Sequence, residues 1–299
     1  MKILIILLIT LLGTSLSDTL KVTQLEGNII LNDSTKLQLG DTIDEKDKIY
    51  IFGKSSLTVK DKHNKSLVIK RSGNYSGYKI KSKLRLSSIN VSSKLANSLL
   101  NELASSDDLL SNTDINSNMN TLGAVERTIY TKNNDIVFMP RNSYVMDNVT
   151  FRWTDDNSEL YVFSLKNTIG NILYSIITSE TELKMNISNL LPNTEEYFFW
   201  DVRSDNGVSE EYCLYRYSEE DIKKIKQEET DLIKQLDLID PIDNLILAKF
   251  YEGYRLNSQS NSYYERCIVM NPDIDEHLRL YYVFLRDNGL KVMPIYRFN

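Results

Sequence analysis

The stretch LLPNTEEYFFWDVRSDNGVSE, residues 190–210, decides how the middle of this chain folds. It begins with Leu-Pro, passes through a polar turn into a run of aromatic residues, and reaches Asn206-Gly207. Aromatic residues favour strands, and Asn-Gly between apolar runs is typical of a tight hairpin turn. The stretch is therefore predicted to be a scaffold strand and its turn, and not an active-site loop.

Similar segments lie on both sides of this strand. Residues 148–156, 160–175, 181–190 and 209–218 are each rich in strand-forming residues and are separated by turn residues. Short strands in close succession are typical of an all-β sandwich. We expect such a sandwich over residues 136–217.

This region resembles a fibronectin type III domain over about 80 residues, as judged by the order of its motifs. The motifs are Trp153 in the second strand and the run Leu191-Pro192, Thr194, Tyr197, Phe199 and Val202 before and within the sixth. The resemblance implies that Tyr197 is a tyrosine corner. Trp200 is expected to face away from Phe199, at the sheet surface, where an exposed tryptophan is a candidate contact residue.

Residues 18–76 alternate between apolar and polar side chains, which predicts short strands and hairpins. In the hairpin around the polar turn DKHNK (61–65), Val59, Leu67 and Ile69 are expected on the buried side, with Lys60 and Lys70 outside.

The same region resembles the FecR-type domain, a small β-rich module of the periplasm. The resemblance rests on Val22, Leu25, Gly27 and Ile29, then Leu39-Gly40-Asp41 and Ile43, then Asp47 and Ile49, then Ser55 to Val59. Gly27 and Gly40 are expected at sharp bends. We expect this chain to share the exported β-module of the FecR family but not its regulatory function. A signal sequence at residue 1 is expected to leave no room for the cytoplasmic segment of transmembrane FecR regulators.

Residues 77–135 are rich in Ser, Asn and Asp and are interpreted as a linker. Leucines at helical spacing predict one short amphipathic helix near 92–104; these are Leu95, Leu99, Leu100 and Leu103. A flexible segment is expected near 105–122.

Residues 218–299 change to a helical period, with Ser218 as the cap of a helix over 219–237. Residues 244–272 resemble one tetratricopeptide repeat through Leu247, Ala248, Tyr251, Ser260, Tyr264, Cys267 and Pro272. Because one repeat cannot bury its own face, the neighbouring helices are expected to pack on it. The resemblance implies that Leu245, Lys249 and Glu252 face a concave contact side.

Residues 1–17, MKILIILLITLLGTSLS, have the layout of a secretory signal peptide. We expect cleavage after Ser17, with a retained membrane anchor as the alternative. Cleavage would leave no transmembrane span, and the mature protein is expected in the periplasm or outside the cell.

The sequence offers few candidates for catalysis. His63 and His277 are the only histidines and are not spaced as metal ligands, the latter being expected on the charged side of a helix. Cys213 and Cys267 are interpreted as independent packing residues. The acidic run 154–159 falls in a predicted turn, where acidic residues are common. We therefore expect neither enzyme activity nor a cofactor or metal.

The formal net charge of −6, without a concentrated basic patch, disfavours nucleic-acid binding. The predicted protein combines a FecR-like β-module, a fibronectin type III-like sandwich and a helical bundle. Such modules suggest a non-catalytic adaptor subunit of a cell-envelope assembly, with contacts made by the helical end and sheet edges. A carbohydrate- or peptidoglycan-binding protein is the alternative, and it requires exposed aromatic residues in a row on one sheet face, with Trp200 and Tyr161 as candidates. A carboxylate enzyme would require two acidic side chains converging in a cleft.

Overall fold

Two long strands, β1 (Leu20–Leu31) and β4 (Lys48–Lys60), pair antiparallel and form the centre of a six-stranded sheet. The structure is a computed structural model that describes residues 19–104, 138–146, 148–187, 190 and 196–289. The shorter strands of this sheet are β2 (Thr35–Lys36), β3 (Thr42–Ile43), β5 (Ser66–Ile69) and β6 (Gly73–Ser76). β2 and β3 pair with β1, whereas β5 and β6 pair with β4.

The predicted hairpin around residues 61–65 is confirmed. Val59 pairs with Leu67, and Val59 and Ile69 are buried. The bend at Gly27 is present as a register shift between Glu26 and Asn28. Gly27 has a φ of +82°, and a Cβ there would lie 2.2 Å from Ser55 Oγ, so both backbone conformation and space favour glycine.

Residues 77–104 form two helices, α1 (Gly77–Ser88) and α2 (Ser93–Ala104). The interpretation of residues 77–88 as linker is wrong, because Ile80 and Leu84 of α1 complete the core of the first sheet. α2 lies where the leucine spacing predicts a helix. The predicted signal peptide (1–17), the flexible segment (105–122) and the Leu191-Pro192 motif lie outside the described residues.

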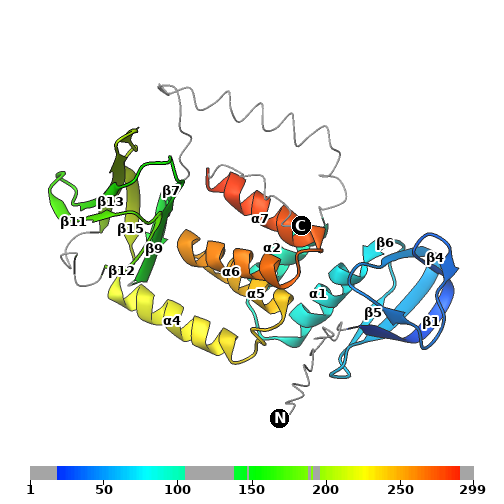
Figure 1. The fold of residues 1–299 in the computed structure, drawn as a ribbon. Helices are drawn as coiled ribbons and strands as arrows, with labels where there is room; N and C mark the ends of the chain where they lie inside the picture. Colours follow the sequence, from blue (N-terminus) through cyan, green and yellow to red (C-terminus); the bar gives the residue numbers. More distant parts are fainter. Residues whose placement is uncertain (1–18, 105–137, 147, 188–189, 191–195, 290–299) are drawn as a thin grey trace, which may run out of the picture. The chain divides into compact units, whose positions relative to one another are not determined.

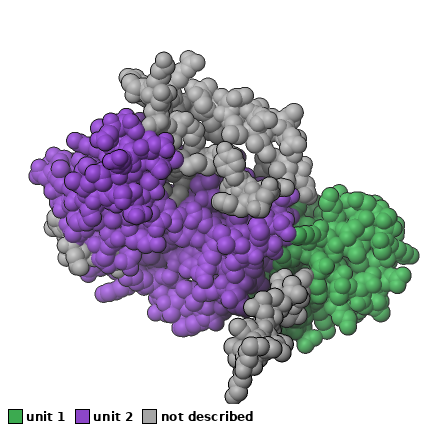
Figure 2. All heavy atoms as spheres, in the orientation of Figure 1, with its two compact units in different colours: residues 1–88 green, residues 89–299 purple. Residues whose placement is uncertain are grey.

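The chain divides into two units, Met1–Ser88 and Ile89–Asn299, which Figure 2 draws in different colours. The first contains the six-stranded sheet and α1. Among its described residues, the second contains α2, two further sheets and the helices of the C-terminal region (Figure 1).

The two sheets of the second unit share one hydrophobic core. One has the order β11-β10-β13-β15-β8, with β14 paired to β13, and the other has the order β12-β9-β7. Their strands are β7 (Phe138–Met139), β8 (Ser143–Val145), β9 (Asn148–Trp153), β10 (Tyr161–Lys166), β11 (Ile172–Thr178), β12 (Glu182–Asn186), β13 (Tyr197–Ser204), β14 (Gly207–Val208) and β15 (Tyr212–Arg216). We call this pair of sheets the sandwich.

The orientation of β13 differs from the prediction. Trp200 is completely buried and donates a hydrogen bond from Nε1 to the carbonyl of Pro140 at 2.9 Å. It packs edge-on against Phe151. The predicted exposure of Trp200 was therefore wrong. Tyr197, one position before the buried Phe198, is 42 % exposed on the opposite face.

The helical end consists of α4 (Glu219–Ile233), α5 (Pro241–Gly253), α6 (Asn257–Met270) and α7 (Asp275–Asp287). Ser218 caps α4 as predicted, because its side chain accepts a hydrogen bond from the Asp221 amide. α5 and α6 form a hairpin in which Ser260 is buried and donates a hydrogen bond to the carbonyl of Ala248 at 2.9 Å.

The described part of the chain is thus a mixed β and α protein, with its later helices in the C-terminal region (Figure 1). None of the helices described has the length and apolar character needed to cross a bilayer.

Candidate functional site

Three tyrosines lie side by side on the outer face of the larger sandwich sheet. Side chains alternate across a strand, so the burial of Leu214 places its neighbour Tyr215 outside. Tyr215 pairs with Tyr144 of β8 on one side and with Tyr197 of β13 on the other. Together with Tyr217, which follows β15, they form a surface that we call the tyrosine patch.

The rings of the patch contact one another. Tyr144 stacks on Tyr217 with ring centroids 4.4 Å apart, and its centroid lies 5.4 Å from that of Tyr215. Tyr197 meets Phe199 nearly edge-on at 6.0 Å. Tyr197 and Tyr215 remain 42 % and 37 % exposed, which leaves apolar ring surface open to a partner.

The loop between α5 and α6 holds one end of the patch. Tyr217 donates a hydrogen bond to the carbonyl of Tyr254 at 2.8 Å, and the Tyr144 amide donates to the carbonyl of Arg255 at 3.0 Å. The Arg255 guanidinium lies 5.9 Å from the centroid of the Tyr144 ring, within the range of a cation–π contact. The helical hairpin thereby fixes the orientation of Tyr144 and Tyr217.

The hydroxyls of Tyr215 and Tyr217 are neutral at physiological pH. A hydrogen bond with Cys213 raises the pKa of Tyr215 above its usual value, and burial raises that of Tyr217. Burial also raises the pKa of the Cys213 thiol, which disfavours the reactive thiolate. The patch is therefore equipped for hydrogen bonding and apolar contact and lacks an activated nucleophile.

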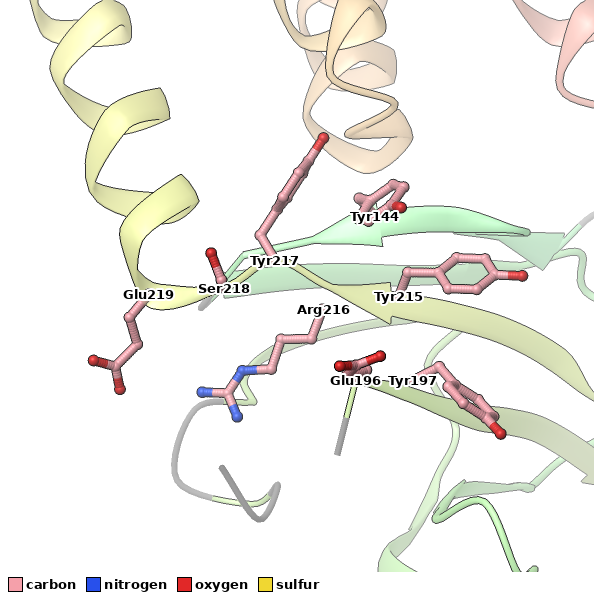
Figure 3. Close-up of a pocket in the computed structure, with 8 residues that line it drawn as sticks. All are labelled: Tyr144, Glu196, Tyr197, Tyr215, Arg216, Tyr217, Ser218 and Glu219. Atoms are coloured by element: carbon pink, nitrogen blue, oxygen red, sulfur yellow. The ribbon is translucent and has the colours of Figure 1, made fainter. Parts of the chain in front are cut away.

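The patch borders a hollow of about 400 Å³, whose lining Figure 3 shows. Besides the four tyrosines, it is lined by Glu196, Arg216, Ser218 and Glu219. One guanidinium stands beside two carboxylates, so the hollow does not present the single-sign charge that binds a polyanion.

Of the predicted contact residues of the helical end, two are buried and one of these pairs with α2. Leu245 is completely buried, and the Lys249 side chain is 2 % exposed. Lys249 Nζ lies 2.5 Å from Glu102 Oε2 of α2 and 3.0 Å from Glu252 Oε1. Partner contact through Leu245, Lys249 and Glu252 stays a prediction, and in this structure it would require α2 to move.

α2 is held there by more than the ion pair. Leu99 and Leu103 are buried, and Arg279 of α7 donates a hydrogen bond to the Glu102 carbonyl at 3.1 Å. These contacts cover Lys249, on the side that the resemblance to a tetratricopeptide repeat implied to be open.

Tyr161, the other candidate for an exposed aromatic row, is also buried. Its hydroxyl donates to Asp155 Oδ1 at 2.7 Å and accepts from the Asp156 amide at 3.1 Å. Burial raises the pKa of Tyr161 to about 12. Although burial of Asp156 acts in the opposite direction, hydrogen bonds led by the one from Ser204 lower its pKa. The acidic turn thus anchors a core tyrosine.

The remaining candidates for catalysis or metal binding are one histidine and two cysteines. His277 is buried, which corrects its predicted place on a charged helix surface, and its Nδ1 lies 3.3 Å from the carbonyl of Asn271. Cys213 and Cys267 are both free thiols; Cys267 is buried, whereas Cys213 is only partly so. In the part of the chain that the structure describes, no group of three or more His, Cys, Asp or Glu residues could hold a metal ion.

Sequence reasoning did not find the tyrosine patch. The signal was present in CLYRY (213–217), where the two-residue spacing of Tyr215 and Tyr217 predicts that both side chains face the same way in an extended chain. The missing information was the parallel pairing of β15 with β8, which brings Tyr144 beside them from a distant part of the chain.

No protein-family model matches this chain, and no curated protein matches it significantly.

Proposed function

We propose that this chain is a non-catalytic adaptor subunit of a cell-envelope assembly and that the tyrosine patch is its protein-contact surface. The observation that carries the proposal is the row Tyr144–Tyr215–Tyr197 across three adjacent strands. Tyrosine is enriched at protein interfaces because a rigid ring offers apolar area and a hydroxyl at little entropic cost. The contacts of the patch with the α5–α6 loop hold part of it ready before a partner arrives.

The proposal includes the assignment of the chain to three modules. The strand orders β11-β10-β13-β15 and β12-β9-β7 support a fibronectin type III-like sandwich, and the α5–α6 hairpin supports a tetratricopeptide-like segment. The six-stranded sheet of the first unit is the proposed FecR-like module. Export to the periplasm or beyond rests on the signal-like residues 1–17.

A carbohydrate- or peptidoglycan-binding protein is the second candidate, because an exposed aromatic row on a sheet face also suits sugar rings. Two features favour protein. Tyr144 and Tyr217 stack on each other and so cover ring faces that a sugar would need. The hollow beside them carries charges of both signs, from Arg216, Glu196 and Glu219.

The test is affinity purification of the tagged full chain from crosslinked native cells. The wild type would be compared with the double variant Tyr197→Ala/Tyr215→Ala and with Val208→Ala, an exposed residue of the same sheet as the matched control. We expect envelope proteins in fixed ratio with the wild type and the control, and their loss with the double variant. Recovery of no protein, together with sedimentation of the chain with purified cell wall, would replace the adaptor by the glycan-binding function.

A further inference from the structure

The outer edge of β11 is unpaired among the described residues. β11 is the last strand of its sheet and pairs only with β10, from Tyr161↔Thr178 to Lys166↔Ile172. Alternate residues of an edge strand direct their amide and carbonyl groups away from the sheet. Such an edge is a template for one more strand.

The composition of β11 gives this edge little protection, and the one irregularity in its pairing with β10 is a register shift at Leu173, near the start of the strand. Its sequence, ILYSIIT, contains no charge, proline or glycine. Ile172 and Ile177 are 60 % and 65 % exposed, and Ile169 in the preceding turn is 78 % exposed. Proteins usually block an open edge with lysine, proline or a bulge.

The edge strand of the facing sheet shows that protection. β12 has the sequence ELKMN, and its Glu182 lies 2.9 Å from Lys184 and 2.5 Å from Arg152. A strand added beside β12 would have to displace or bury these charges, which is costly. Of these two edge strands, β12 therefore carries charges that oppose strand addition and β11 does not.

We propose that β11 pairs antiparallel with β11 of a second copy of this chain. Centred on Ser175, the pairing places Tyr174 opposite Ile176 of the second copy. It also places Ile177 opposite Leu173, the residue at which β11 shifts register against β10. Every opposed pair within the strand is then uncharged, and apolar cross-strand pairs of this kind are stabilising.

Pairing with a second copy also explains how an apolar edge strand can avoid open-ended aggregation. A two-fold contact uses the same strand of both copies, so the association closes at a dimer and cannot continue into a fibre. The larger sandwich sheets of the two copies would then form one continuous sheet. A pairing of seven-residue strands lies at the small end of specific interfaces, so we expect the dimer to depend on concentration.

The first test is the molar mass of the full purified chain by light scattering across a dilution series. We expect twice the mass of one chain at high concentration. Ile177→Lys should reduce the mass to that of one chain, because a charge on the edge blocks strand addition. Val208→Lys is the matched control, as Val208 is similarly exposed, at 64 %, in the same sheet, and it should leave the dimer intact.

A second test uses Ser175→Cys, which would bring two thiols together across the two-fold axis. Mild oxidation should give a covalent dimer with Ser175→Cys and not with Val208→Cys, both retaining the native cysteines. A wild-type monomer at every concentration, or a dimer that survives Ile177→Lys, would overturn the proposal. Because both tests use the chain alone, their outcome is independent of whether the adaptor function holds.

Discussion

The tyrosine patch and the surface of α5 differ in what covers them. Both present aromatic and charged side chains on regular elements, and the sequence pointed to the second as the contact site. Tyr197 and Tyr215 remain substantially exposed, whereas Leu245 and Lys249 are buried and Lys249 forms an ion pair with Glu102 of α2. The difference shows that a helical period identifies the face of a helix but not the segment that packs on it.

The first prediction sharpens the distinction between the two faces of β13. Trp200→Ala should lower the free energy of unfolding by about 3–5 kcal/mol, because it removes a fully buried ring and its hydrogen bond to Pro140. Tyr197→Ala on the exposed face should cost no more than about 0.5 kcal/mol. Urea denaturation followed by fluorescence and circular dichroism measures both, and equal losses would contradict the assigned orientation.

The second prediction concerns the ion pair that joins α2 to α5. Lys249→Met leaves the Glu102 and Glu252 carboxylates without their cation, and breaking a buried pair costs about 3–5 kcal/mol. Because both carboxylates are 28 % exposed, we expect about 2–4 kcal/mol here.

Its matched control is Lys234→Met, since that lysine is 66 % exposed and pairs with Asp231 at the surface. The control should change the unfolding free energy by less than about 0.5 kcal/mol. Hydrogen exchange in α5 should also accelerate in the Lys249 variant alone. Unchanged exchange would show that α2 does not depend on this ion pair.

The third prediction concerns how the stability that Asp156 contributes to the sandwich depends on pH. Asp156→Asn should destabilise the chain at neutral pH by about 1.5–3 kcal/mol, because Asp156 as a carboxylate accepts hydrogen bonds from the Ser204 hydroxyl and the Ser158 amide. The pKa of Asp156 is lowered on folding, so its contribution is complete above the ordinary value of 3.8 and is lost as the pH falls through the folded pKa.

The stabilities of wild type and Asp156→Asn should therefore converge in acid, which urea denaturation across a pH series would show. A constant difference between the two proteins from neutral pH into acid would mean that ionisation of Asp156 is not the source of the effect.

The fourth prediction has the smallest expected effect and tests how the patch is held. Tyr217→Phe removes the hydrogen bond to the Tyr254 carbonyl and keeps the ring stacked on Tyr144. We expect a loss of about 0.5–1.5 kcal/mol. A melting temperature equal to that of the wild type, measured by calorimetry, would show that the hydroxyl does not tie the patch to the helical hairpin.

Much of the β structure could be predicted where apolar residues alternate with charged ones. The hairpin of β4 and β5 has lysines on its outer side, so only one orientation buries Val59 and Ile69. β13 begins YFFWDV, and its continuous apolar run fits either orientation. Its pairing with β10 places Trp200 opposite the buried Leu165, which settles the orientation only in the folded chain.

The helices show the same limit. α2 was predicted from its leucines, but its position over Lys249 depends on contacts between segments distant in sequence. α1 was missed because KIKSKLRL (79–86) alternates like a strand and is rich in polar residues, while Ile80 and Leu84 also satisfy helical spacing.

The most direct test of the proposed contact surface is site-specific photo-crosslinking in native cells. A benzophenone amino acid would replace Tyr197 on the sandwich in one variant and Val269, which is 80 % exposed on α6, in the other. We expect a discrete protein adduct from position 197 and none from position 269. An adduct from position 269 alone would place the contact at the helical end and contradict the account given for the tyrosine patch.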